Sequence, residues 1–272
     1  MKKVILITGC SSGLGLVLAR RLSVDHIVYA SMRNSSKIEY FEKDSSPSFI
    51  PIRIDVRESE SIVSALSVIK EKHNKLDILI NNAGIMQVGF FEDVPEKVVR
   101  ELLETNFFGV VTLTKKALPL LKESGDAKII NISSSSGLMA MPALSAYASS
   151  KWAVEGFSES LRFELYSMGI QVLLIEPGLI RTELLQENFK VCEDPNSNYS
   201  KEMDQLLKMW KGRDPKTFLD PAEVAKVIEK RIYQKNPPFR TVLSRLSKIK
   251  LLLKRTLPYS LYEKIVLKVL KI

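Results

Sequence analysis

Tyr147 and Lys151 stand four residues apart in the segment YASSK, a spacing that suits proton chemistry. The surrounding segment has a helical pattern, and side chains four residues apart share one face of a helix. A phenol with its ordinary pKa of about 10 is a poor base at neutral pH, but a nearby ammonium favours the phenolate and lowers that pKa. Tyr147 could then give or take a proton, with Lys151 as its electrostatic partner. Such pairs also occur on exposed helices that carry no function.

Other polar residues follow strand-like apolar runs. Four serines, Ser133 to Ser136, follow the run 128–132, and Asn82 follows the run 78–81. Pro177 and Gly178 come just after a third run, 171–175. Open parallel sheets bind ligands at the carboxyl ends of their strands. We therefore expect these residues to meet at one edge of a sheet, where a serine hydroxyl can hydrogen-bond a substrate oxygen.

The segment TGCSSGLG, residues 8–15, joins the first apolar run to the first helical pattern. Gly9, Gly13 and Gly15 lack Cβ atoms, so the backbone can turn tightly and approach a pyrophosphate. The N-terminus of the following helix would add free N–H groups and a partial positive charge. The spacing GxxxGxG thus indicates a dinucleotide-binding loop, and a plain tight turn is the alternative.

The end of the second predicted strand bears on the choice of cofactor. Many dinucleotide folds place an acid there to hold the ribose 2′-hydroxyl. This chain has no acid between Ser31 and Glu39 and carries Arg33 instead. A guanidinium can pair with a 2′-phosphate, and Ser11 and Ser12 can add hydroxyl donors. We expect NADP(H) to be preferred, with NAD(H) as the alternative if Arg33 is only a solvated surface residue.

Strand-like and helix-like segments alternate along most of the chain. Strands are predicted at 4–8, 27–31, 49–54, 78–81, 128–133 and 171–175, and helices at 13–22, 58–72, 97–121 and 145–168. The strand segments are rich in Ile and Val with little polar alternation, as in parallel strands covered on both faces. This pattern predicts an α/β fold: one domain with a Rossmann-type doubly wound parallel sheet of about seven strands and helices on both faces.

Two regions depart from this alternation. Residues 180–218 are polar and irregular, which is typical of a substrate lid. The apolar residues within them either line a pocket or form the buried face of a lid helix; they are Leu184, Leu185, Phe189, Met203, Leu206, Leu207, Met209 and Trp210. We therefore divide the chain into a dinucleotide-binding domain at 1–244, lid included, and a C-terminal tail at 245–272. Asp220 and Pro221 look like a helix cap and first turn.

Composition excludes several classes of protein. The 272 residues are 45% hydrophobic and 26% charged, as in ordinary globular chains. Two cysteines and two histidines at scattered positions give no disulfide framework and no metal site. Apolar runs are too short for a membrane-spanning helix. An apolar start resembling a secretory signal is broken by the glycine loop, so we expect a cytoplasmic protein.

Most of the net charge of +9 belongs to the tail. Residues 245–272 hold eight basic side chains and one acid, leaving 32 basic and 30 acidic side chains elsewhere. No nucleic-acid recognition motif accompanies this charge, so we expect no nucleic-acid partner. The apolar residues of the tail alternate with lysines, which suits a helix lying on an anionic membrane surface. It equally suits an apolar stripe packed on the domain with its lysines in water.

Taken together, these motifs resemble the short-chain dehydrogenase/reductase family from Lys3 to about Tyr233. They are TGCSSGLG at 8–15, Asp55-Val56, NNAG at 81–84, Asn106, the serines 133–136, YASSK at 147–151 and Pro177-Gly178. The resemblance implies that Tyr147 is the catalytic acid/base and that Lys151 lowers its pKa and binds the nicotinamide ribose. It further implies that Ser134 orients the substrate and that Asn106 holds a water in a proton relay.

The resemblance also implies a cofactor-binding set. It comprises Gly9, Ser11, Ser12, Gly13, Leu14, Gly15, Arg33, Asp55, Val56, Asn82, Ala83, Gly84, Tyr147, Lys151, Pro177, Gly178, Ile180 and Thr182. Asp55 and Val56 would cradle the adenine, and the segment from Pro177 to Thr182 would bind the carboxamide end. The reaction implied is reversible hydride transfer between the nicotinamide and a carbonyl or alcohol carbon.

Several runs are similar to the 17β-hydroxysteroid and retinol dehydrogenase branch, which implies a bulky apolar substrate that is steroid-, retinoid- or lipid-like. They are residues 8–15, 28–33, 136–142 and 152–161. Two alternatives stay open: an NAD-dependent alcohol dehydrogenase with an unrelated substrate, and a non-catalytic dinucleotide-binding sensor. Family members usually pair through the segments 97–121 and 145–168, which implies a homodimer or homotetramer.

Overall fold

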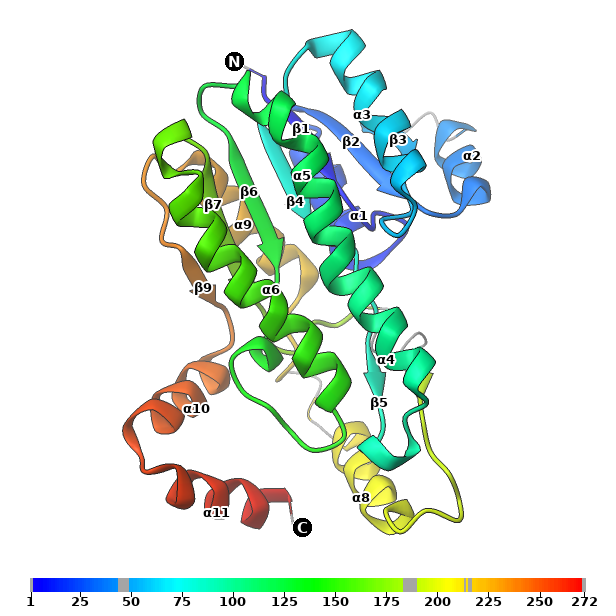
Figure 1. The fold of residues 1–272 in the computed structure, drawn as a ribbon, viewed down its shortest axis with the longest axis vertical. Coiled ribbons are helices and arrows are strands. Elements are labelled where there is room, and N and C mark those ends of the chain that lie inside the picture. Colours follow the sequence, from blue (N-terminus) through cyan, green and yellow to red (C-terminus); the bar gives the residue numbers. More distant parts are fainter. Residues whose placement is uncertain (1, 44–48, 183–189, 213, 215–216, 271–272) are drawn as a thin grey trace.

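In the computed structural model, which describes residues 2–43, 49–182, 190–212, 214 and 217–270, seven parallel strands form one twisted sheet (Figure 1). Its order is β3-β2-β1-β4-β6-β7-β9. The strands are β1 (Val4–Ile7), β2 (Ile27–Met32), β3 (Ile50–Arg53), β4 (Ile78–Asn81), β6 (Lys128–Ile132), β7 (Gln171–Glu176) and β9 (Arg240–Val242). The predicted doubly wound Rossmann-type sheet is confirmed. The sequence pattern located six of its strands and missed β9, which has only three residues and follows two prolines.

The strand order reverses between β1 and β4. From β1 the chain builds outward through β2 to β3, then returns to β4 beside β1 and continues through β6 and β7 to β9. Loops that leave β1 and β4 therefore diverge to opposite sides of the sheet at their carboxyl ends. Ligands of open α/β sheets bind in the crevice that forms at such a point.

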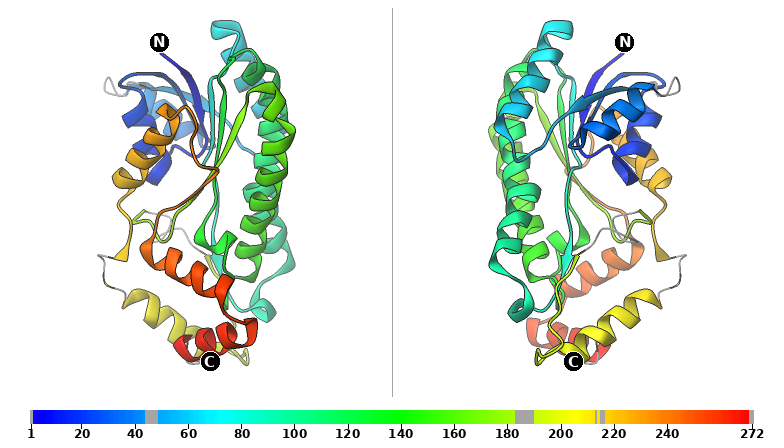
Figure 2. Two further views of the ribbon diagram at one scale, coloured as in Figure 1. Left: turned by 90° about the vertical axis from the view of Figure 1, so that its left-hand side faces the viewer. Right: turned by 90° about the vertical axis from the view of Figure 1, so that its right-hand side faces the viewer.

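Helices cover both faces of the sheet, and Figure 2 shows the two layers edge-on. One layer contains α1 (Gly13–Leu22), α2 (Ser35–Lys43) and α9 (Pro221–Tyr233); the other contains α3 (Ser59–His73), α4 (Glu96–Leu103), α5 (Gly109–Lys122) and α6 (Ser145–Glu164). Alternate residues of β1 enter the two cores: Ile5 and Ile7 join the first, and Val4 and Leu6 join the second. The Ile- and Val-rich strands are thus buried on both faces, as expected.

The helix predicted at 97–121 is interrupted. Between α4 and α5, residues Glu104–Phe108 form one π-helical turn, η2, in which Asn106 is 1% exposed. Such a turn inserts an extra residue into the helical ladder and is frequent at functional sites. Because the apolar periodicity continues on either side, the sequence pattern did not reveal it. The helix predicted at 145–168 ends at Glu164, before a short 3₁₀ turn, Tyr166–Met168.

The region predicted as an irregular lid contains regular elements. A short strand, β8 (Lys190–Val191), pairs with β5 (Gln87–Val88) in a separate two-stranded parallel sheet. Helix α8 (Ser200–Lys211) follows, with Met203 and Leu206 buried, so their helical spacing marks a packed face. Leu184, Leu185 and Phe189 lie outside the described residues. As predicted, Asp220 caps α9, because its side chain accepts the Ala222 N–H at 2.8 Å.

The tail forms two helices, α10 (Arg245–Thr256) and α11 (Tyr259–Leu270), which run below the sheet toward α8 (Figure 1). Lys254 of α10 donates to the Leu138 carbonyl at 2.7 Å and lies 4.5 Å from the centre of the Trp152 ring. Val266 of α11 packs against the apolar cluster that contains Met203 and Leu206. Among the described residues, no helix is long and apolar enough to cross a membrane.

Candidate active site

A cavity of about 620 Å³ lies at the carboxyl ends of the central strands. Every residue of the predicted catalytic and cofactor-binding sets lines it, except Asn106. Ser133, Ser135, Ser136 and Trp210 also line the cavity; the sequence had placed the serines at a strand end and Trp210 among residues that could line a pocket. The sequence reasoning had not assigned the other lining residues: Ile54, Arg57, Ile85, Met86, Thr105, Ile132, Met141, Leu144 and Leu179. The structure therefore brings together, from across the chain, side chains that the sequence placed only near strand ends.

The glycine loop forms one wall, and its close packing explains its glycines. Gly9 has a positive φ of 71°, and a Cβ there would lie 2.8 Å from the Ala83 Cα atom. A Cβ on Gly15 would lie 2.6 Å from Asn82 Nδ2. Thr8 joins the loop to β4, because its hydroxyl oxygen accepts the N–H groups of Asn82 and Ala83, each at 2.9 Å.

Helix α1 begins at Gly13, at the edge of the cavity, so its first N–H groups are not bonded within the helix. No side chain in the described part of the structure caps this end. Free N–H groups and the helix dipole suit an anion, and the missing Cβ atoms leave room for it. This arrangement fits the pyrophosphate of a dinucleotide.

Two arginines and one acid line the far end of the cavity. Arg57 binds the Asp55 carboxylate through two nitrogens, at 2.7 and 3.0 Å, and these hydrogen bonds hold the pKa of Asp55 below its usual range although burial opposes them. Arg33 is exposed and forms no hydrogen bond or ion pair with any residue that the structure describes. Sequence reasoning missed Arg57, although it stands only two residues after Asp55.

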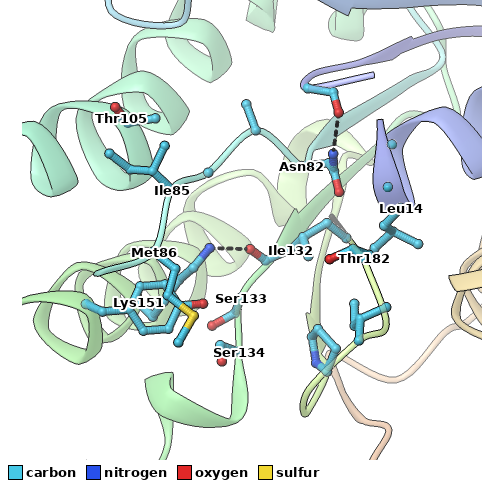
Figure 3. A pocket seen from close by; sticks show the side chains of 18 of the residues that line it. Leu14, Asn82, Ile85, Met86, Thr105, Ile132, Ser133, Ser134, Lys151 and Thr182 are labelled. Carbon is cyan, nitrogen blue, oxygen red and sulfur yellow. Dashed lines mark hydrogen bonds between the residues drawn. The ribbon is translucent and has the colours of Figure 1, made fainter. Parts of the chain in front are cut away.

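Ser134, Tyr147 and Lys151 line the opposite part of the cavity. Lys151 is 6% exposed, and its ammonium donates to the Ile132 carbonyl at 2.9 Å (Figure 3). Burial lowers the pKa of Lys151 to about 8, against the opposing charge of Glu155. Ser133 and Ser134 follow the end of β6 and line the same cavity as Lys151 (Figure 3).

The expected lowering of the Tyr147 pKa is not found in this structure. Burial raises the pKa of Tyr147 above its ordinary value, and the Ser134 hydroxyl only partly opposes this. The Lys151 ammonium is itself desolvated and bonded to a carbonyl, so it does not overcome the cost of a buried phenolate. The raised pKa favours a protonated phenol at neutral pH.

Asn106 lies just outside the cavity wall. Its carbonyl oxygen accepts the Ile85 N–H at 2.8 Å, and its amide donates to the Ile85 carbonyl at 2.9 Å and to the Ser150 hydroxyl at 3.0 Å. The π-helical turn therefore fixes the loop after Gly84, where a Cβ would approach both Asn106 and Lys151. This contact with the loop was not expected from the sequence.

Beyond Tyr147 the cavity becomes apolar. Met86, Met141, Leu144 and Trp210 line this end. They belong to a larger cluster that joins β5, the loop before α6, and α8. From the lid region, Ile180, Thr182 and Trp210 line the cavity, and of these Trp210 comes from α8. A site of this kind can hold an apolar ligand beside the Tyr147 hydroxyl.

Comparison with known sequences gives three informative relatives. The family model for short chain dehydrogenase matches residues 3–192. Uncharacterized oxidoreductase YusZ of Bacillus subtilis is 38% identical over 276 residues, covering 98% of each chain. The 3-ketodihydrosphingosine reductase of Bacteroides thetaiotaomicron is 35% identical, covering 91% of this chain and 90% of its own. Retinol dehydrogenase 8 of Bos taurus is 34% identical, covering 88% and 80%.

Solved structures show the same architecture. A short-chain dehydrogenase from Streptomyces avermitilis superposes with a TM-score of 0.82 at 30% identity, covering 97% of this chain and 95% of its own. An actinorhodin polyketide ketoreductase, solved with NADPH, gives a TM-score of 0.75 at 26% identity, covering 89% and 96%.

Proposed function

The chain belongs to the short-chain dehydrogenase family, and from this premise we propose that it is an NADP(H)-dependent enzyme that interconverts a carbonyl and an alcohol on a bulky apolar substrate. That it is an oxidoreductase of the NAD(P)-dependent dehydrogenase/reductase type follows from the family. The observation that carries the proposal is a single cavity that joins the glycine loop, the Ser134–Tyr147–Lys151 group and an apolar end.

Tyr147 is the proposed acid/base. Its phenol is protonated at neutral pH, as a proton donor to a substrate carbonyl oxygen must be, and proton transfer of this kind contributes roughly 100- to 10,000-fold to the rate. Ser134 lies against the phenol and can orient the same substrate oxygen. The bound nicotinamide supplies or accepts the hydride. Lys151 stabilises the phenolate that remains after proton transfer, because its ammonium is buried beside the site.

Asn106 has a positioning role in this proposal. Its hydrogen bonds fix Ile85 and the turn after Gly84, so the wall next to Lys151 keeps its shape. The water-mediated relay inferred from the family resemblance remains a proposal for this residue. In this structure both amide hydrogens of Asn106 are already donated, so only its carbonyl oxygen has capacity left for a water.

The residues that would hold the cofactor follow its length through the cavity. The loop from Gly9 to Gly15 and the first turn of α1 would bind the pyrophosphate, and Asp55 and Val56 would flank the adenine. Asn82, Ala83 and Gly84 would line the adenosine ribose, and Lys151 would bind the nicotinamide ribose. The segment Pro177, Gly178, Ile180 and Thr182 would bind the carboxamide end.

The preference for NADP(H) rests on the two arginines at the adenine end. Arg57 neutralises Asp55, whose carboxylate is thereby occupied and cannot serve freely as a ribose acceptor. Arg33 lines the same end and remains available to a 2′-phosphate. The ketoreductase solved with NADPH and this chain share the fold, which is consistent with the same cofactor here.

The proposed substrate is steroid-, retinoid- or lipid-like. Met86, Met141, Leu144 and Trp210 give the substrate end of the cavity an apolar, adaptable wall. Two of the similar enzymes act, by their names, on a ketosphingoid base and on retinol. A ketone or an alcohol on a long apolar molecule would match a cavity with polar groups at one end.

A screen of purified protein tests this function. Apolar ketones, aldehydes and alcohols are offered with NADPH, NADH and their oxidised forms, and nucleotide absorbance is followed. Tyr147→Phe should lose roughly 100- to 10,000-fold in kcat while it still binds NADPH. Faster turnover with NADH would favour an NAD-dependent alcohol dehydrogenase. Nucleotide binding without turnover of any substrate would favour a sensor, and the proposal would fail.

We also propose that the tail brings a cytoplasmic enzyme to the membrane surface. Leu246, Ile249 and Leu252 of α10 are 57–62% exposed, although the opposite face of the helix carries Lys254 and packs on the domain. Exposed basic residues flank this stripe, including Arg245 and Lys248. Apolar side chains among cations suit the surface of an anionic bilayer. In this proposal one face of α10 packs on the domain, and the other face contacts the membrane.

Vesicle flotation tests this contact. Wild type should float with anionic vesicles at low salt and much less with zwitterionic ones. The triple substitution Leu246→Ser, Ile249→Ser and Leu252→Ser should abolish flotation. The control substitutions Val63→Ser and Val68→Ser, which change exposed valines of α3, should leave it unchanged. If wild type and the triple variant were found in equal amounts in the anionic-vesicle fraction, the exposed stripe of α10 would not bind the membrane, and the tail would only pack on the domain.

A homodimer or homotetramer is the proposed assembly. The outer surface of α6 and the turn after it leave large aromatic side chains in solvent: Phe163 is 73% and Tyr166 is 83% exposed. Phe108, in η2, is 47% exposed. Large apolar side chains left in solvent can become buried in an interface between subunits. Sedimentation of wild type and of Phe163→Glu tests the assembly, because a charge in a buried interface should release monomer.

A further inference from the structure

Four charged side chains meet behind the catalytic residues, around Arg240 of β9. Nη1 of Arg240 donates to Glu155 of α6 and, at 3.0 Å, to Glu176 at the end of β7, while Nη2 donates to Glu159 at 2.9 Å. Glu155 and Glu176 are buried, at 6% and 0% exposure. The Glu159 side chain is about half exposed. Because Glu155 and Glu176 bind the same nitrogen atom, their carboxyl groups lie close together.

The charges of this cluster do not balance if both buried acids are ionised. Arg240 supplies one positive charge, and two carboxylates on one of its nitrogens would repel each other. A second buried cation, Lys151, lies one turn before Glu155 on α6, but its ammonium donates to the Ile132 carbonyl and has no hydrogen bond to either acid. A buried charge without a partner is costly, so one of the two acids is expected to carry a proton.

Unmade hydrogen bonds point to the same place. Glu155 Oε1, Glu176 Oε2 and the Ser133 hydroxyl are buried, and none forms a hydrogen bond within the part of the chain that the structure describes. A Cβ on Gly137 would lie 2.7 Å from Ser133 Oγ and 3.1 Å from Glu155 Oε1, so these two atoms border one small space. The Ser133 hydroxyl can turn toward Glu155 Oε1, which leaves Glu176 Oε2 without a donor. A proton shared by the two acids supplies a second donor for these buried oxygens.

The acidities agree with this geometry. Burial raises the pKa of Glu176, and the neighbouring charge of Glu155 raises it further, against the attraction of Arg240. Burial also raises the pKa of Glu155, while the nearby Ser133 hydroxyl and Arg240 oppose the shift. Both acids therefore hold a proton at a higher pH than an exposed carboxyl group.

We propose that Glu155 and Glu176 share one proton, and that this pair, clamped by Arg240, positions Lys151 and the Ser133–Ser134 turn for the reaction. Glu155 stands one turn from Lys151, and Lys151 holds the carbonyl directly before Ser133. Loss of the proton would place two negative charges together between α6 and β7 and displace these elements. The positioning role rests on the proposed oxidoreductase function, whereas the shared proton does not.

Infrared spectroscopy of the whole protein tests the shared proton without any turnover. At neutral pH, wild type should show the carbonyl stretch of a buried protonated carboxyl group. Glu155→Gln and Glu176→Gln should each remove that band, because a single remaining acid can ionise beside Arg240. Glu159→Gln, which alters the exposed partner of the same arginine, should keep it. A wild-type spectrum without the band would overturn the proposal.

The pH dependence of kcat tests the positioning role. As pH rises and the shared proton leaves, wild-type kcat should fall by roughly 10- to 100-fold, with little change in KM for the nucleotide. Glu176→Gln should lack this fall, because its amide stays neutral at every pH. Any change of kcat with pH that is due to ionisation of Tyr147 or Lys151 should remain in both proteins. If Glu176→Gln does not fold, Glu155→Gln replaces it, since either change removes the shared proton.

The two failures are distinguishable. Identical pH profiles for wild type and a folded Gln variant would overturn the positioning role. A wild type that turns over no carbonyl or alcohol would overturn the proposed function instead, and the infrared result would stand by itself.

Discussion

Replacing Arg33 with alanine should weaken NADPH binding and leave NADH binding almost unchanged. The guanidinium lines the adenine end of the cavity and forms no hydrogen bond or ion pair with any described residue, while Arg57, at the same end, is bound to Asp55. A 2′-phosphate is the only group that distinguishes the two nucleotides. The effect should therefore appear in their ratio of dissociation constants and not in overall affinity.

The magnitude follows from the exposure of Arg33. A hydrogen bond to a charged group contributes about 1.5–3 kcal/mol, and solvent screening reduces that figure for an exposed side chain. We expect a loss of about 1–2 kcal/mol for NADPH, which corresponds to roughly 5- to 30-fold in Kd. Because the contact is solvent-exposed, the difference should shrink as salt is added.

Titration by nucleotide fluorescence measures both constants, at low and at physiological salt. Arg20→Ala is the matched control, because Arg20 is an exposed arginine on α1 that does not line the cavity. An unchanged ratio in Arg33→Ala would refute the reasoning and leave Arg33 as a surface residue. Equal losses for NADPH and NADH would mean that Arg33 supports the fold of this wall and does not read the phosphate.

Three further changes should each have a distinct effect. Gly15→Ala should destabilise the fold by about 1–3 kcal/mol and weaken nucleotide binding, because the new Cβ would lie 2.6 Å from Asn82 Nδ2. Thermal unfolding with and without NADPH measures both effects. A variant as stable as wild type and equally stabilised by NADPH would contradict the close packing of the loop. Burial would raise the pKa of Asp77, but hydrogen bonds from Ser124 and two other donors hold it below its usual range. Its stabilising contribution is therefore complete above the unfolded-state pKa and lost as pH falls through the folded-state value, so urea unfolding of Asp77→Asn should depend less on acid pH than that of wild type. Lys128→Met should cost about 1–3 kcal/mol per carbonyl left unpaired, because its buried ammonium donates to two carbonyls at the end of α9, at 2.6 and 2.7 Å; a stability equal to wild type would mean that water replaces these bonds.

Much of the site could be predicted from sequence because its residues are tied to local backbone geometry. Gly9 and Gly13 adopt positive φ angles, and the loop that they form must follow the first strand and start a helix. Tyr147 and Lys151 share a helical face by spacing alone. The predicted family is confirmed by the match over residues 3–192 and by relatives that include retinol dehydrogenase 8.

Other features left no local signal. The π-helical turn at Asn106 is held by hydrogen bonds between Asn106 and Ile85 on a distant loop. The three-residue strand β9 exists because it pairs with β7 at the sheet edge. Each depends on which segments become neighbours in space, which periodicity does not encode.

The sequence by itself determined the alternation of strands and helices, the dinucleotide loop and the Tyr147–Lys151 pair, since these arise from residue type and short-range spacing. Only the tertiary structure decided what surrounds them. Burial raised the pKa of Tyr147 where proximity to a lysine had predicted the opposite. Folding also brought Glu155, Glu176 and Arg240 from three separate elements onto one another. Desolvation and long-range charge pairing depend on the whole packed molecule, and so no single segment of the sequence could disclose them.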